Sequence, residues 1–332
     1  MKAVIPVAGM GSNLRPHTHT QPKALVPVAG KPILGHIIDS LLDAKIHDFV
    51  LIIGYLGDKI EKYVTQQYPD INVSYVIQEP RLGLGHAISL TATFFKQDEQ
   101  MLILLGDTII YADLQAFINS ETTVLGVKKV DNPRLFGVAE MDGNGFIKKL
   151  IEKPTIPKSN FALVGIYKVL HSQQLLEELN HLITNGLKTQ NEFQLTDALM
   201  QLISKGEKMT TLQVNNWYDC GKKESLLEAN AILLNRLGYN NTRYPEFDNN
   251  IIIPPVSIGK NCHLQHSIIG PNVAIGDDTK IENSIVENSI IGSFSELQQV
   301  VLKQSIIGND TTLQGLSQSL NIGDNTEINF SR

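Results

Sequence analysis

The sequence predicts an α/β fold followed by a second, repetitive domain built from short strands. Up to about residue 237, short apolar runs alternate with helical patterns, and the segment 238–250 is polar and rich in turn-forming residues. After it, Ile-Gly pairs recur at nearly regular intervals. Alternating strands and helices are typical of a sheet covered by helices, whereas a short fixed period is typical of a solenoid. We therefore expect a first domain over 1–237, a linker over 238–250 and a strand stack over 251–332.

The strands of the first domain are expected where Val, Ile and Leu occupy consecutive positions. Such continuous apolar strands are typical of a parallel sheet that is buried on both faces. The later runs differ in character, and we expect them to extend the first strands into a mixed sheet. The predicted strands cover 2–8, 48–54, 73–78 and 101–106, and in the extension 122–130, 136–141, 146–151 and 162–169.

Two helices frame the first domain. One is predicted to begin at Pro32, because proline is favoured at a helix start and an apolar stripe follows it. Another, around 222–237, is expected to close the domain. The apolar stripe of the first helix consists of Ile33, Leu34, Ile37, Ile38, Leu41 and Leu42.

Length and composition limit the possible classes of protein. The chain has 332 residues, 42% of them hydrophobic, and a formal net charge of −6. This length predicts two domains, and the negative charge argues against general nucleic-acid binding, which needs a basic face. Only Cys220 and Cys262 occur, so no disulfide framework is expected. The sequence MKAVIPV at the start resembles neither a signal peptide nor a membrane span, and we expect a cytoplasmic protein with no membrane partner.

The segment 8–32 is typical of a polyphosphate site. The first predicted strand leads into Gly9 and Gly11, and then into Arg15 and Lys23. Glycine lets the backbone turn sharply and direct N–H groups at phosphate oxygens, and a lysine adds positive charge near a phosphorus atom under attack. The segment is neither a Walker loop nor a dinucleotide fingerprint, because the residues that define those motifs are missing.

Two aspartates are candidate ligands for a metal ion. Asp107 follows a predicted strand in LLGDTI, and Asp219, in WYDCG, comes after a strand expected at 209–214. Carboxylates that lie at strand ends can share one Mg²⁺, which prefers oxygen ligands. The sequence therefore predicts a magnesium site at this edge of the sheet.

The motifs G-x-G, L-R-P and P-K-x-L-x-P-V-x-x-K-P-I-L together resemble the signature of the sugar-1-phosphate nucleotidylyltransferases. Further matches follow in order, in VIQEPRLGLGHA, FGVAE, IEKP, ALVGIY and NEFQLTD. The resemblance implies a Rossmann-like domain that uses Mg²⁺ to join a pyrimidine nucleoside triphosphate to a sugar 1-phosphate, with release of pyrophosphate. It implies that Arg15, Lys23 and Asp107 act in catalysis, that Ala8, Gly9, Gly11, Ser12, Gln78 and Gly83 bind the nucleotide, that Gly137, Glu152, Lys153, Gly165 and Glu192 bind the sugar phosphate, and that Asp107 and Asp219 bind the metal.

The chain departs from the family pattern at two phosphate contacts. The family usually has arginines where this chain has Asn13 and Gln190. A missing guanidinium weakens the stabilisation of a phosphoryl transition state. Arg15 or Lys188 could take over from nearby, with altered geometry. Glu192 also has an alternative role, as a cap of the helix expected near Gln194.

The last part of the chain resembles the left-handed parallel β-helix of hexapeptide-repeat proteins. Aliphatic residues recur about three hexapeptides apart, which predicts a short stack of about five triangular coils. His263 and His266 lie in this stack, and related folds host acyltransferases that use a histidine. The Ile-Gly pairs are Ile258-Gly259, Ile269-Gly270, Ile275-Gly276, Ile291-Gly292, Ile307-Gly308 and Ile322-Gly323, with Ile328 as the last aliphatic partner.

Three functions remain open from the sequence. The first is an enzyme that transfers a nucleotidyl group from dTTP or UTP to glucose 1-phosphate or a related sugar. The second is a catalytically weak subunit that senses nucleotide sugars or acts as a scaffold, which Asn13 and Gln190 would favour. The third is a bifunctional enzyme with an acetyltransferase tail. In each case we expect a homo-oligomer.

Overall fold

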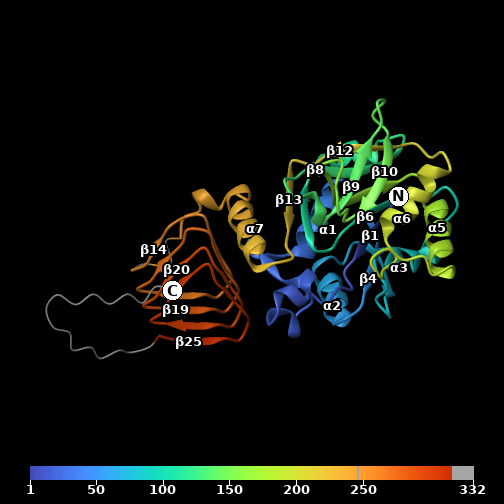
Figure 1. The fold of residues 1–332 in the computed structure, drawn as a ribbon. Helices are drawn as coiled ribbons and strands as arrows, with labels where there is room; N and C mark the ends of the chain where they lie inside the picture. Colours follow the sequence, from blue (N-terminus) through green and yellow to red (C-terminus); the bar gives the residue numbers. More distant parts are fainter. Residues whose placement is uncertain (245–246, 248, 316–332) are drawn as a thin grey trace. The chain divides into compact units, whose positions relative to one another are not determined.

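The computed structural model describes residues 1–244, 247 and 249–315. The chain divides into two compact units, at Met1–Ala229 and from Asn230 onward (Figure 1). A short 3₁₀ turn, Tyr239–Asn241, lies within the segment expected to be a linker. Within the described residues, no helix is long and apolar enough to cross a membrane.

A mixed sheet forms the centre of the first unit, as predicted. One part of it consists of β6 (Met101–Leu104), β1 (Lys2–Pro6), β4 (Asp48–Ile53) and, at the end of the strand order, β5 (Asn72–Ile77), and neighbours in this series are parallel. β11 (Phe161–Val169) pairs antiparallel with β6 and so makes the sheet mixed. The remaining strands beyond β11 are β8 (Thr123–Lys129), β9 (Gly137–Met141), β10 (Ile147–Glu152) and β12 (Met209–Gln213).

Helices cover the faces of this sheet and explain why its central strands are apolar throughout. Figure 1 shows α3 (Leu84–Ser89), α5 (Ser172–Thr184) and α6 (Leu195–Ser204) grouped beside the sheet, and their apolar residues share one core with it. Helix α1 (Ile33–Asp43) begins after Pro32, as expected. The other helices are α2 (Gly57–Gln67), α4 (Leu114–Ile118) and α7 (Lys223–Arg236).

A small antiparallel ribbon stands apart from the main sheet. It pairs β7 (Thr108–Tyr111) with β13 (Asn216–Asp219), and Asp219 lies opposite Thr108. The strand expected at 209–214 is present as β12 (Met209–Gln213), and Asp219 ends a further strand after it that was not predicted. This arrangement could not be expected from the local sequence, because the partner strand is more than one hundred residues away in the chain.

The second unit is a left-handed parallel β-helix, as predicted. Three parallel sheets of four strands form its sides, and the aliphatic residues of all three point into one core. The strands are β14 (Ile251–Ile252), β17 (Ile268–Ile269), β20 (Ile285–Glu287) and β23 (Val301–Lys303) on one side, β15 (Val256–Ile258), β18 (Val273–Ile275), β21 (Ile290–Ile291) and β24 (Ile306–Ile307) on the next, and β16 (His263–Gln265), β19 (Lys280–Glu282), β22 (Glu296–Gln298) and β25 (Thr312–Gln314) on the third.

The coils are shorter than three hexapeptides. Leu264, Ile281, Leu297 and Leu313 stack one on the next in successive coils, and the intervals between them are 17, 16 and 16 residues. The pair Ile269-Gly270 also belongs to a different side from Ile258-Gly259. The last predicted pair, Ile322-Gly323, and its partner Ile328 lie outside the described residues.

Candidate active site

The glycine-containing loop after β1 is folded tightly on itself. Gly11 has a φ of +61°, and a Cβ at this position would lie 2.8 Å from Cγ2 of Thr18 and 2.9 Å from Cβ of Lys23. The Thr18 hydroxyl donates a hydrogen bond to the Gly11 carbonyl oxygen at 2.7 Å. Only glycine fits this conformation and this space. Around Gly9, by contrast, no atom would lie within 4 Å of an added Cβ, so the backbone there is open to a ligand.

The other predicted residues of this loop occupy different environments. Ala8 is buried, whereas Ser12, Asn13 and Arg15 are exposed in and after the 3₁₀ turn Ser12–Leu14. Two residues from helix α2 and the loop before it hold the far end of the loop. The Tyr55 hydroxyl donates to the carbonyl oxygen of His19 at 2.9 Å, and the Lys59 ammonium donates to that of Thr20 at 2.5 Å.

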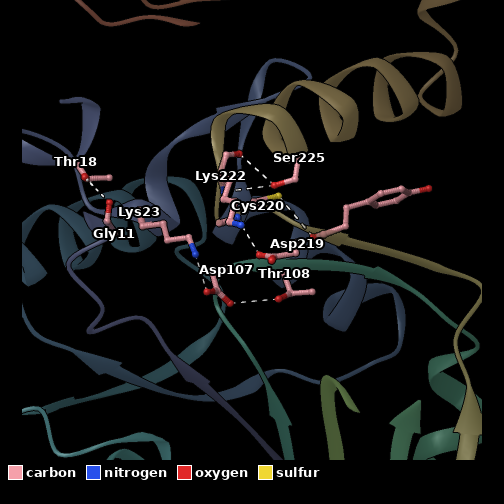
Figure 2. A network of polar contacts seen from close by, with 11 residues as sticks. Gly11, Thr18, Lys23, Asp107, Thr108, Asp219, Cys220, Lys222 and Ser225 are labelled. Atoms are coloured by element: carbon pink, nitrogen blue, oxygen red, sulfur yellow. Dashed lines mark hydrogen bonds and ion pairs between the residues drawn. The ribbon is translucent and has the colours of Figure 1, made fainter. Parts of the chain in front are cut away.

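Lys23 and Asp107 form an ion pair at the centre of the site. The Lys23 Nζ lies 2.6 Å from Oδ2 of Asp107, and only 15% of the Lys23 side chain is exposed (Figure 2). Asp107 occupies the turn between β6 and β7, at the carboxyl end of β6. A cavity of about 220 Å³ lies beside the pair. Its lining comprises Pro6, Val7, Gly9, Lys23, Ala24, Leu84, Leu105, Gly106 and Asp107.

Asp219 is brought to the same place by the β7–β13 ribbon. The backbone N–H of Cys220 donates to the Asp107 carbonyl oxygen at 3.0 Å, and that of Gly221 to Oδ1 of Asp219 at 2.9 Å (Figure 2). Although the residue is open to solvent on one side, loss of hydration around its carboxyl group raises the pKa of Asp219. The negative charge of Asp107 raises this pKa further.

These two carboxylates fit a magnesium ion better than a metal that needs a complete protein cage. Within the part of the chain that the structure describes, no three His, Cys, Asp or Glu side chains gather as a metal site. Mg²⁺ is usually held by one or two carboxylates, while water and substrate phosphates complete its shell. The repulsion that raises the pKa of Asp219 is also what a bound cation would relieve.

Gln78 and Gly83 lie together on the side of the site expected to hold the base. The buried Gln78 amide nitrogen donates to the Gly83 carbonyl oxygen at 3.0 Å. Gly83 has a φ of +108°, and a Cβ there would lie 2.7 Å from the carbonyl oxygen of Phe193. The glycine is thus required by close backbone packing, a reason that the motif alone does not reveal. A second cavity, of about 400 Å³, is lined by Tyr55, Ile77 and Gln78 among others.

Glu152 lies at the end of β10, on the side expected to hold the sugar. The Thr196 hydroxyl donates to its Oε2 atom at 3.3 Å, and burial raises the pKa of the Glu152 carboxyl. Gly137 makes the necessary space, since a Cβ there would lie 2.9 Å from Oε2 of Glu152. The next residue, Lys153, has a positive φ of 41°, so the chain turns sharply after the glutamate.

Gly165 shapes the turn that carries Asp107. Its φ is +90°, and the register of β11 shifts between Leu163 and Tyr167, around this glycine. Its carbonyl oxygen accepts a hydrogen bond from the Leu105 backbone N–H at 2.9 Å. A Cβ on Gly165 would lie 2.8 Å from side-chain atoms of Leu105, so this glycine has a packing role next to the turn that carries Asp107.

Glu192 does not cap helix α6. The cap position is Gln194, which makes no capping hydrogen bond, and Glu192 instead ends a tight turn in which Gln190 and Asn191 both have positive φ. Phe193, the next residue, connects the Glu192 turn, on the side expected to hold the sugar, with the Gly83 loop, on the side expected to hold the base. The Phe193 N–H donates to the Leu82 carbonyl at 2.8 Å, and the Gly85 N–H donates to the Phe193 carbonyl at 2.7 Å.

Several contacts were not predictable from the motifs. Phe193 joins the loop of Gly83 to that of Glu192, and Lys188 places its ammonium 5.0 Å from the Phe193 ring centre. The Trp217 ring packs against that of Phe136, with the ring centres 5.0 Å apart. The contacts of Phe193 with Leu82 and of Trp217 with Phe136 join residues far apart in sequence, and no local spacing indicates them.

Comparisons with known proteins agree with this geometry. The family model described as nucleotidyl transferase matches residues 2–236. A glucose-1-phosphate thymidylyltransferase of Streptomyces griseus is 31% identical over 314 residues, which cover 88% of this chain and 87% of that protein. The low-salt glycan biosynthesis nucleotidyltransferase Agl11 of Haloferax volcanii is 35% identical over 242 residues, or 70% of this chain and 66% of its own length. The bifunctional protein GlmU of Methanocaldococcus jannaschii is 37% identical over 254 residues, but this chain spans only 59% of it.

Solved structures show the same fold for the first part of the chain. A Bacillus anthracis chain solved with sucrose, provisionally described as a glucose-1-phosphate thymidylyltransferase, has a TM-score of 0.61 at 29% identity and covers 74% of this chain and 97% of its own. A UDP-glucose pyrophosphorylase solved with UDP-glucose has a TM-score of 0.62 at 23% identity and covers 71% of this chain and 98% of its own, which supports the fold alone.

Proposed function

This chain belongs to the nucleotidyl transferase family, and we propose that it transfers a nucleotidyl group from dTTP or UTP to glucose 1-phosphate or a related sugar 1-phosphate, releasing pyrophosphate. The observation that carries the proposal is the cluster of Lys23, Asp107 and Asp219 beside a cavity and an open glycine loop. Cations and carboxylates in this arrangement suit a reaction between two phosphates.

The reaction needs little acid–base chemistry from the protein. The sugar phosphate is already a nucleophile near neutral pH, because the second pKa of a phosphate monoester is about 6. One of its oxygens forms a bond to the α-phosphorus of the nucleotide, the bond from that phosphorus to the bridging oxygen breaks, and pyrophosphate leaves. The protein must therefore align two anions and stabilise their charge.

The residues of the cluster divide this work. Lys23 would place its ammonium against the α-phosphate, where negative charge builds up during transfer. Its partner Asp107, together with Asp219, would hold a divalent ion, which supplies charge neutralisation for phosphate oxygens when bound. The open backbone at Gly9 would accept the triphosphate chain, and Arg15, exposed at the edge of the loop, would add a further cation.

The environment of Gln78 favours uracil or thymine over cytosine. One hydrogen of its amide nitrogen is donated to the Gly83 carbonyl, and the same nitrogen lies 3.5 Å from Nδ1 of His86, which leaves the amide oxygen as the acceptor that a base can reach. Uracil and thymine carry a donor at N3, whereas cytosine carries an acceptor there. The Streptomyces griseus relative is named a thymidylyltransferase, which favours dTTP, and the proposal includes UTP because uracil and thymine present the same edge to Gln78.

The sugar would lie between Glu152 and Glu192. Two carboxylates can accept hydrogen bonds from several sugar hydroxyls, and Lys153 would contact the sugar phosphate next to Glu152. Phe193 ties this side to the Gly83 loop, so that base and sugar would be held by connected backbone.

Pyrophosphate release tests the proposal directly. Purified protein with glucose 1-phosphate and Mg²⁺ is offered dTTP, UTP, CTP, ATP and GTP in separate reactions. Release with dTTP or UTP alone is the expected result. Silence with all five nucleotides, while a nucleotide still raises the melting temperature, would instead identify a sensing or scaffolding subunit.

A second candidate function follows from the relatives named bifunctional protein GlmU. In this case the β-helix would add an acetyltransferase activity, with His263 or His266 as its base. The matched segment of the Methanocaldococcus jannaschii relative covers 76% of this chain. If the full chain acetylates an amino sugar phosphate from acetyl-CoA, the variants His263→Ala and His266→Ala should lose that activity and keep pyrophosphate release.

A further inference from the structure

Two exposed lysines follow almost directly after Asp219. Lys222 precedes helix α7 and Lys223 is its first residue. Neither ammonium group forms a hydrogen bond or an ion pair with any residue in 1–244, 247 or 249–315. Lys23, by contrast, is paired with Asp107. The ammonium groups of both lysines are therefore available to an anionic ligand at the edge of the site.

The backbone fixes where these lysines begin. The Cys220 N–H is bound to the Asp107 carbonyl, and the Gly221 N–H to the Asp219 carboxylate. The first turn of α7 is closed by Ser225, whose hydroxyl donates to the Lys222 carbonyl at 3.1 Å (Figure 2). Lys222 is therefore anchored within three residues of one candidate metal ligand, on a segment bound to the other.

The charges of the two lysines act on opposite parts of the site. Burial lowers the pKa of His17, and the charge of Lys223 lowers it further, so Lys223 lies near the loop expected to hold the triphosphate. Lys222 lies close enough to the Asp219 carboxyl for its charge to act on that group. Together the lysines add positive charge near His17 of the loop and near Asp219.

This position matches what the chain lacks. Asn13 and Gln190 stand where the resembling family carries arginines, and Lys188 is occupied with the ring of Phe193. Lysine is a suitable phosphate ligand, since its ammonium acts as a compact charge with three donors. We propose that Lys222 and Lys223 bind the β- and γ-phosphates of the nucleotide, and hence the pyrophosphate that leaves. This inference rests on the proposed function and names further binding residues for it.

Binding of inorganic pyrophosphate tests the assignment without requiring turnover. Titration calorimetry of the full chain with pyrophosphate and Mg²⁺ should give a Kd about tenfold weaker in the double variant K222Q/K223Q, the size expected when charge-assisted contacts are lost. The variant K222R/K223R should restore binding to near the wild-type value. Lys62→Gln, which removes an exposed lysine from α2, is the matched control and should leave the Kd unchanged.

The reverse reaction separates phosphate binding from a general structural effect. With a nucleoside diphosphate sugar as co-substrate, the KM for pyrophosphate should rise in K222Q/K223Q while the KM for the sugar nucleotide stays constant. An unchanged pyrophosphate Kd in the double variant, or no pyrophosphate binding by the wild type, overturns the assignment. Pyrophosphate binding without release from any nucleotide would overturn the proposed function instead, and the Kd values would still decide the role of the lysines.

Discussion

At the scale of single residues, Asp219 has two opposing effects on the protein. Its carboxylate is the candidate metal ligand, yet its folded-state pKa is raised by burial and by Asp107. A raised carboxyl pKa means that the ionised form costs stability above that pKa, and that the cost disappears as the pH falls through it toward the pKa of the unfolded chain. A bound cation would favour the ionised Asp219 carboxyl, whereas without a cation the same ionised group lowers the stability of the folded protein.

We therefore predict that Asp219→Asn is inactive but more stable than the wild type without metal. Pyrophosphate release should fall by about 10²–10³-fold, the range for loss of one group that stabilises transition-state charge. The metal-free melting temperature should rise at neutral pH, and this difference should close as the pH is lowered. Calorimetric melts from pH 4 to 8 and the release assay measure both effects.

Asp107→Asn is the paired experiment. Because Asp107 is the other candidate metal ligand, the same assay should show a comparable loss of activity. Its far-ultraviolet circular dichroism should remain that of the wild type. Near-normal turnover in either asparagine variant would contradict the assignment of these aspartates as the metal pair.

Gly137 offers a test of the sugar side that changes no charged group. Its added Cβ in Gly137→Ala would lie 2.9 Å from Oε2 of Glu152 and from Cδ1 of Leu163, so the carboxylate must move. We expect the KM for the sugar phosphate to rise about tenfold, equivalent to about 1.4 kcal/mol, with little change in the KM for the nucleotide.

Gly143→Ala is the control for this substitution. It lies in the turn between β9 and β10, and no atom lies within 4 Å of an added Cβ. Its kinetic constants should equal those of the wild type. If both alanine variants raise the KM for the nucleotide equally, the result contradicts the interpretation that Gly137 makes the space in which Glu152 is positioned to bind the sugar.

At the scale of elements, local pattern predicted most of the structure and long-range pairing accounts for the rest. The apolar strands and the helix after Pro32 appear within a few residues of their predicted bounds, since burial of continuous apolar runs leaves few alternatives. The β7–β13 ribbon was missed, because its register depends on residues from distant parts of the chain. The coil length was overestimated, because the corners of the β-helix need fewer residues than a regular hexapeptide count supplies.

The corners show how the shorter coil is possible. Non-glycine residues with positive φ occur at the turns between sides. Apart from Phe294 they are Asn, Asp, His and Gln, of which the first three are the residue types that best tolerate that conformation. Asn272 and Asn288 stand one coil apart, and the amide of Asn272 donates to Oδ1 of Asn288 at 2.8 Å. Such side-chain contacts between coils fix the stacking at each corner.

The inward positions of the β-helix should carry its stability. Ile281 is fully buried and stacks between Leu264 and Leu297, whereas Ile285, four residues later, is 41% exposed. Ile281→Ala should cost about 2–5 kcal/mol through lost burial and a cavity. Ile285→Ala should change the free energy of unfolding by no more than about 0.5 kcal/mol. Urea denaturation of the full chain measures both, and equal losses would contradict the inward and outward assignment.

At the scale of the whole molecule, the sequence predicted the two architectures but not how distant segments complete the candidate active site. The glycine loop, Lys23 and Asp107 are close in space because the strands of a parallel sheet end at one edge, which a strand pattern indicates. The approach of Asp219 and the link from Gly83 to Phe193 depend on tertiary packing. Asp219 was indicated by its place after a predicted strand as well as by the family resemblance, whereas Gly83 was indicated by the resemblance alone. Lys222 and Lys223, which we propose as substitutes for the missing arginines, could not be identified from spacing alone.

The separate cores lead to a prediction about unfolding. The main core of the first unit joins residues between Val4 and Met209, and that of the second joins residues between Phe247 and Leu313, with no residue in common. We expect calorimetry of the full chain to resolve two transitions, since each core can melt without exposing the other. Nucleotide with Mg²⁺ should raise only the transition of the first unit, because a ligand stabilises the part that binds it. Ile281→Ala should lower only the other. A single transition that responds to both the ligand and Ile281→Ala would show that the two units unfold as one, and helix α7, which runs across the boundary at residues 229–230, would be the element to examine first.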